Sequence, residues 1–153
     1  MNILKKQYYL SEILRLKRGN SRGTLVNAKP IFILSLIESI GNGVIKENII
    51  TYPAKQVEDI YKELSISYEP WKVPSPFILP YYHMVNESYY HIKWKGDKFV
   101  VSSHAHSPSG RYLTENSEYA YLDQELWDLL QNYNVREEFR ELIINFFIKP
   151  KRD

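Results

Sequence analysis

The chain has no cysteine, only six glycines in 153 residues, and no long apolar run. The absence of cysteine excludes a disulfide framework and every metal site built from thiolates. The apolar segments stay well below the roughly 20 residues that a membrane-spanning helix needs. The lysines near the N-terminus are not followed by the apolar segment of a secretory signal. We therefore expect a cytoplasmic protein that does not enter a membrane.

Common motifs of catalysis and nucleotide binding are also missing. The glycines at positions 41 and 43 are expected to end a helix, so they do not form a phosphate-binding loop. Ser109 lacks the glycine two residues before it that a nucleophile elbow requires. We expect no cofactor and no enzymatic activity.

One alternative is an enzyme that holds a metal ion on His104 and His106. If this segment is a strand, residues two apart point to the same face, so both imidazoles could reach one ion. A third ligand would be needed, and Asp97, His91 and Glu115 are available.

The patterns that are present are mainly helical. Tyr9, Ile13 and Leu16 recur at helical spacing, and similar stripes predict helices in the last quarter of the chain. Residues 31–40 are apolar on nearly every side and are closed by Gly41, so they predict a central buried helix. At 18.2 kDa the chain is long enough for one core. We predict a single mainly helical α+β domain over residues 1–153.

A small β region is predicted after the middle of the chain. Residues 81–85 and 88–94 read as two strands around Asn86 and Glu87, which gives a small antiparallel β-hairpin. Residues 99–101 could add an edge strand.

Residues 70–94 combine four prolines with seven tyrosine, tryptophan and phenylalanine rings. Prolines hold the backbone extended, and clustered rings can line an apolar pocket with polar tips. The alternative is that these rings fill the core of a small sheet. Both interpretations stay open at this point.

Charge is segregated along the chain. Residues 1–30 carry seven basic residues and one acid, a net charge of +6, whereas residues 113–148 carry a net charge of −6. Such a distribution favours one basic face that attracts phosphates, although a charged run can also be only a solvated face. Lys29 stands at the entry of the predicted central helix, where backbone N–H groups already favour anions.

Six segments carry a further pattern, in order along nearly the whole chain. They are Arg18-Gly19 to Arg22-Gly23, residues 29–37, Leu79-Pro80-Tyr81-Tyr82-His83-Met84, residues 89–92, residues 120–130 and residues 136–147. Together they resemble the DNA-recognising domain that precedes HNH nuclease modules in bacterial restriction endonucleases, a group that includes the sulfur-binding domains that read phosphorothioate DNA.

The resemblance implies a module that binds the backbone of double-stranded DNA through basic residues and recognises one backbone position in an apolar pocket. Sulfur is larger and more weakly hydrated than oxygen, so moving it from water to an apolar wall costs less free energy. By position, this assigns Arg22 and Lys29 to phosphates, and we add Arg18 and Arg111 as further phosphate ligands. The specificity pocket would consist of Leu79, Pro80, Tyr81 and His83. Ordinary packing is the alternative for Pro80 and Tyr81.

We therefore expect a DNA-binding module, most simply a reader of modified DNA in a restriction or phage-defence system. In the family an HNH module normally follows this domain, whereas this chain ends at Asp153. We expect no cleavage of DNA by the chain alone. The alternative is a protein-interaction subunit whose acidic segment, residues 113–148, docks a nuclease on another chain.

Overall fold

The computed structural model describes residues 3–21, 23–96 and 108–149. Its helices and strands follow one another as α1 (Ile3–Leu14), β1 (Asn20–Ser21), β2 (Thr24–Leu25), α2 (Ala28–Gly41), α3 (Lys55–Tyr68), α4 (Ile78–His83), η1 (Met84–Asn86), β3 (Tyr90–Trp94), α5 (Gly110–Asn116), β4 (Ser117–Leu122), α6 (Gln124–Leu129), α7 (Tyr133–Ile143) and η2 (Ile144–Ile148). This order confirms the predicted mainly helical α+β fold. Within the described ranges, no helix combines the length and apolar character that crossing a bilayer requires.

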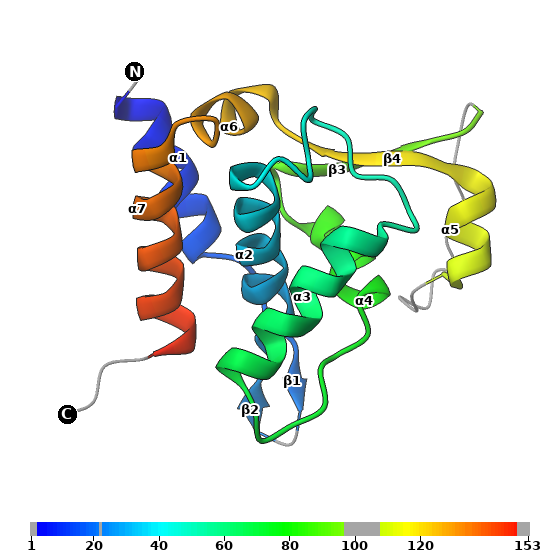
Figure 1. Cartoon of the computed structure of the whole chain (residues 1–153), viewed down its shortest axis with the longest axis horizontal. Helices are drawn as coiled ribbons and strands as arrows, with labels where there is room; N and C mark the ends of the chain where they lie inside the picture. Colours follow the sequence, from blue (N-terminus) through cyan, green and yellow to red (C-terminus); the bar gives the residue numbers. More distant parts are fainter. Residues whose placement is uncertain (1–2, 22, 97–107, 150–153) are drawn as a thin grey trace.

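Helix α2 is the centre of the fold, as its apolar sequence predicts. It lies between α3 and α7 and also packs against α4 (Figure 1). Every residue from Pro30 to Ile37 is buried. Ser35 and Ser39 are tolerated there because their hydroxyls donate to the carbonyls of Phe32 and Ser35, at 2.6 and 2.7 Å. The N-terminal end of α2 points toward the short β1–β2 hairpin (Figure 1).

The predicted hairpin over residues 81–94 is wrong. Strand β3 pairs antiparallel with β4, a strand that the sequence did not predict, with Tyr90 opposite Leu122 and Ile92 opposite Ala120. The small hairpin that does occur is β1–β2, near the N-terminus. The proposed edge strand at residues 99–101 falls outside the described residues.

Residues 81–85 are helical, and Pro80 is compatible with this because it lies in the first turn of α4. Phe77 is the N-cap of this helix, so Pro80 is its third residue. The N–H groups of a first helical turn have no intrahelical acceptor, and a proline there costs no hydrogen bond. Pro80 therefore does not prevent the helix that follows it.

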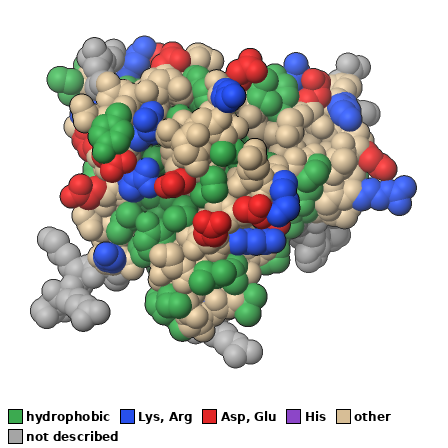
Figure 2. Space-filling model, viewed as in Figure 1, with side chains coloured by type: hydrophobic (Ala, Val, Ile, Leu, Met, Phe, Trp, Pro, Cys, Tyr) green, Lys and Arg blue, Asp and Glu red, His purple; other side chains and the backbone are tan. Residues whose placement is uncertain are grey.

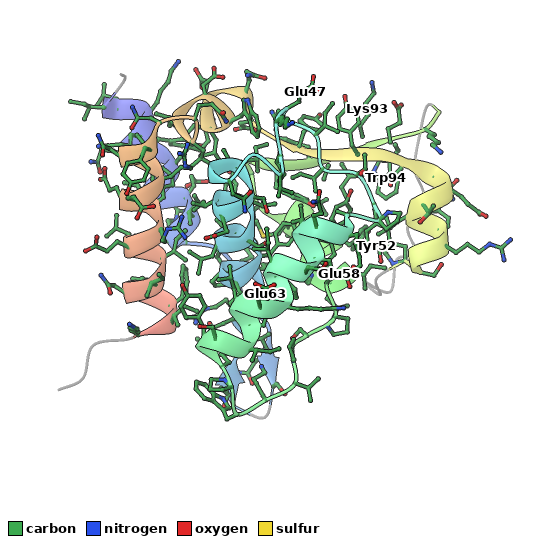
Figure 3. The ribbon with its side chains drawn as sticks, in the orientation of Figure 1. Glu47, Tyr52, Glu58, Glu63, Lys93 and Trp94 are labelled. Carbon is green, nitrogen blue, oxygen red and sulfur yellow. The ribbon has the colours of Figure 1, made fainter. Side chains whose placement is uncertain are left out.

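Aromatic rings fill the core beside α2. Phe32 packs edge-on against Tyr81 and Tyr90, with centroids 6.4 and 5.8 Å away, and Phe77 completes the cluster. Tyr52 extends it from the loop before α3, close to Glu58 at the start of that helix (Figure 3). Burial, and to a lesser extent the charge of Glu58, raises the pKa of Tyr52. Most of the seven rings in residues 70–94 are therefore buried in the core, but their cluster packs on helix α2 and not only on a small sheet.

The two oppositely charged segments of the sequence partly neutralise each other. On α1, Lys5 pairs with Glu125 of α6, and Lys6 bonds Glu138 of α7 at 2.9 Å. Basic and acidic side chains accordingly alternate on the face shown in Figure 2. The segregation in sequence therefore does not translate into a basic surface over all of residues 1–30.

Candidate functional site

A pocket of about 390 Å³ lies between the start of α2, helix α4 and the chain that leads into β1. We call it the α2–α4 pocket. Its lining combines these residues: Lys17, Arg18, Gly19, Asn20, Val26, Ala28, Lys29, Ser75, Leu79, Pro80, His83 and Asn86. Five residues that the sequence assigned to DNA contacts or to the specificity pocket are thus brought together here, from three separate segments.

One wall of the pocket is formed by α4, through the exposed Leu79, the buried Pro80 and the half-buried His83. Residues three and four apart share a helix face, so Leu79 and Pro80 lie beside His83 one turn later. Leu79 is 37% exposed, which leaves apolar surface facing the pocket. This spacing explains why the sequence Leu-Pro-Tyr-Tyr-His presents its first, second and fifth residues together.

Tyr81 does not belong to this wall. It lies on the opposite side of α4, is completely buried, and donates its hydroxyl to the carbonyl of Ile50 at 2.7 Å. Tyr90 in turn donates to the carbonyl of Tyr81. The assignment of Tyr81 to the pocket is corrected here to a core role.

The other wall is the first turn of α2, where Ala28 and Lys29 line the pocket. The N-cap residue Asn27 makes no side-chain cap to this helix. Its amide instead donates to Glu69, and its oxygen accepts from Arg18. The first-turn N–H groups are therefore left uncapped by Asn27, at the end of the helix that attracts anions.

Lys29 is held by an acidic partner. Its ammonium lies 2.8 Å from Oε2 of Glu87, and the side chains are only 12% and 7% exposed. The same oxygen accepts the backbone N–H of Lys17 at 3.3 Å. A buried carboxylate needs such partners, since an unpaired charge is costly away from water. Lys29 is thus positioned at the pocket rather than freely extended.

Arg18 lines the pocket, but its guanidinium contacts residues outside the pocket lining. Its guanidinium lies 4.8 Å from the centre of the Phe147 ring and donates to Asn27 at 2.9 Å. This contact ties the chain before β1 to the end of the chain's last helical segment. The Arg18 guanidinium is thus held in place by Phe147 and Asn27, and its phosphate role stays a prediction.

His83 forms a neutral edge of the pocket. Burial lowers its pKa below the ordinary value, and the nearby charge of Lys29 lowers it further. The imidazole is therefore uncharged at pH 7. An uncharged edge is compatible with a pocket that favours weakly hydrated atoms.

The remaining predicted site residues are not part of this pocket. Arg111 lies in α5, not in a loop, and its exposed guanidinium pairs with Glu115 at 3.1 Å. Arg22, His104 and His106 fall outside the described residues. Among the residues that the structure does describe, no three histidine or acidic side chains gather in a way that could hold a metal ion.

Sequence reasoning missed Lys17, Asn20, Val26, Ser75 and Asn86, which also line the pocket. The basic run before Gly19 was a signal for Lys17, whose side chain is exposed. The other four carry no sequence signal of their own, because only the fold brings them to one place.

A second pocket, also about 390 Å³, lies on a different part of the surface. Its polar centre is Asp123, which accepts from Tyr9 at 2.8 Å and lies 2.6 Å from Nε2 of His91. Both carboxylate oxygens are thus occupied by the chain itself. This arrangement ties α1 to β3 and to the start of α6, which is a structural role.

Comparison with known proteins shows a similarity of fold. No protein-family model and no curated protein matches the sequence. A solved structure described as "Sulfur binding domain and SRA domain of ScoMcrA complexed with phosphorothioated DNA" is similar, with a TM-score of 0.68 and 13% sequence identity. The match covers 91% of this chain and 42% of that one. At this identity, the two chains share a fold.

Proposed function

We propose that this chain binds the backbone of double-stranded DNA and receives one backbone position in the α2–α4 pocket. The observation that carries the proposal is the convergence of Lys29, from the start of α2, with Leu79, Pro80 and His83 of α4. A cation beside an apolar wall suits a group that is anionic overall but has one weakly hydrated atom. A phosphorothioate is such a group, because sulfur replaces one phosphate oxygen.

The similar fold of a protein whose structure was solved with phosphorothioated DNA supports the same proposal. The match spans nearly all of this chain. We therefore propose a reader of phosphorothioate DNA that acts in the cytoplasm, as part of a restriction or phage-defence system. It uses no cofactor.

The chain is proposed to bind DNA without cutting it. Glu87, the acidic residue beside the pocket, is bonded to Lys29 and to the Lys17 backbone. It is therefore engaged and poorly placed to ligate a catalytic metal ion. Cleavage would be supplied by a nuclease on another chain or in another module.

A second candidate function is docking of such a nuclease. Helix α7 and the segment after it, which belong to the acidic region of the sequence, expose Tyr133, Leu142 and Phe146. Leu142 and Phe146 lie four residues apart and so share one helix face, and neighbouring exposed apolar side chains favour a protein contact surface. Capture of a neighbouring nuclease by the wild-type chain, lost when Leu142 and Phe146 are both changed to serine, would support this role.

The proposed DNA function is tested by fluorescence anisotropy with two matched duplexes, one plain and one phosphorothioate, over a salt series. We expect binding to both at low salt and tighter binding to the sulfur duplex. Each contacted phosphate should contribute a slope of about −0.9 in log affinity against log salt. Absence of binding to both duplexes at low salt would refute the proposal.

A further inference from the structure

Glu87 is a buried acid at the edge of a pocket that we propose to receive an anion. It follows η1, and its own N–H bonds the carbonyl of Met84 at 2.9 Å. Only 8% of the residue is exposed. An acid at this place is unexpected, because a negative charge beside a phosphate site opposes binding. We therefore consider what Glu87 does at this position.

The geometry shows what Glu87 does to the pocket. Through one oxygen it holds the ammonium of Lys29 at 2.8 Å and the backbone N–H of Lys17 at 3.3 Å. An ammonium has three N–H donors, so this contact leaves donors on Lys29 for a second partner. The positive charge of Lys29 is, however, largely offset by the adjacent carboxylate. On the α4 side of the lining, burial lowers the pKa of His83, and the charge of Lys29 lowers it further, so His83 adds little positive charge at pH 7. Lys17 and Arg18 also line the pocket.

We propose that Glu87 is the residue that sets the selectivity of the α2–α4 pocket for sulfur over oxygen. The inference rests on the DNA function proposed above. A phosphate oxygen that enters the pocket loses strong hydration, and an uncompensated buried cation would offset that loss. Glu87 neutralises Lys29, which is the buried cation of the lining. Lys17, by contrast, is exposed to solvent, and Arg18 is engaged by Asn27 and Phe147. A sulfur atom loses less hydration on entering the pocket and gains apolar contact with Leu79 and Pro80, so it binds there more favourably than oxygen.

The test is the Glu87→Gln variant. Glutamine keeps an oxygen that can accept from Lys29 and Lys17, but it removes the negative charge. We expect affinity for the plain duplex to rise about threefold or more, on the scale of one partly screened charge interaction. Affinity for the sulfur duplex should rise less, so the preference for sulfur falls. The salt slope on the plain duplex should steepen toward one further phosphate.

Glu12→Gln is the matched control. Glu12 lies nearby on α1, where its two oxygens accept from Ser88 and Arg15 at 3.0 and 3.2 Å. The substitution removes the same charge without touching Lys29. It should change binding to the two duplexes by the same factor and leave the ratio of their affinities as in the wild type.

The outcomes separate this inference from the function on which it rests. If the wild type binds neither duplex, the DNA function itself fails. If the wild type prefers sulfur and Glu87→Gln keeps that preference, or weakens both duplexes equally, the role of Glu87 is overturned. Should Glu87→Gln melt before the assay temperature, the Lys29→Gln/Glu87→Gln double variant replaces it. With the pair again neutral, it should retain the sulfur preference, and loss of that preference would contradict the inference.

Discussion

Replacing Leu79 by aspartate is expected to weaken binding to plain and phosphorothioate duplexes by at least about tenfold, which corresponds to about 1.4 kcal/mol. The reason is twofold. The substitution removes apolar surface from the wall of the α2–α4 pocket, and it places a carboxylate where a backbone anion is proposed to bind. Leu79 is 37% exposed, so the fold should tolerate the change. Anisotropy titrations at fixed salt measure the effect.

Leu142→Asp is the control for this experiment. Leu142 lies on α7, outside the pocket, and is 36% exposed, which matches Leu79 closely. Both variants change the net charge by the same amount. If Leu142→Asp weakens DNA binding as much as Leu79→Asp does, the effect is one of overall charge and the pocket has no special role.

Truncating Tyr81 to alanine is expected to lower the free energy of unfolding by about 3–5 kcal/mol, the usual cost of removing a large buried ring. Tyr81 is completely buried against Phe32, Phe77 and Tyr90. The truncation also leaves the carbonyl of Ile50 without its hydroxyl donor. A loss of this size is a large part of the 5–15 kcal/mol that stabilises a typical domain. Denaturant unfolding followed by circular dichroism would measure it.

Tyr81→Phe distinguishes a core role from a pocket role. This variant keeps the ring and removes only the hydrogen bond to Ile50, so we expect a loss of about 1 kcal/mol in stability and unchanged DNA binding. Loss of the sulfur preference in a folded Tyr81→Phe protein would instead place the hydroxyl in the binding site, against the structure.

The sequence predicts those parts of the fold that depend on neighbouring residues. The run of apolar residues up to Gly41 identifies α2, and the stripe through Phe139 and Ile143 identifies α7, because each pattern reports one helix and its buried face. The pocket wall was not predicted in this way. Leu79, Pro80 and His83 were assigned through the family resemblance, and their helical spacing follows from α4, where a strand had been predicted from residue 81.

Features that join distant segments were not predicted. Strand β3 finds its partner beyond residues 95–116, and no local pattern specifies such a pairing. Lys29 and its partner Glu87 are 58 positions apart, so the sequence did not show that the charge of Lys29 is paired. The contact of Arg18 with Phe147, far along the chain, was hidden in the same way.

The role of Tyr81 could not be separated from that of Pro80 by sequence alone. A strand through residues 81–85 would have turned alternate residues to one side, whereas the helix that forms turns Tyr81 to the core and Leu79 to the pocket. Pro80 does not decide between a strand and a helix, because a proline is compatible with both an extended segment and a first helical turn.

The central claim is that the α2–α4 pocket receives one side of a DNA backbone position. Sulfur can replace either of the two non-bridging oxygens of a phosphate, which gives two diastereomers of a singly modified duplex. The most direct measurement is the affinity of the wild-type chain for each pure diastereomer and for the plain duplex, at one salt concentration. The account predicts that one diastereomer binds about tenfold tighter than the plain duplex, while the other binds like the plain duplex. Equal affinity for all three duplexes would contradict it.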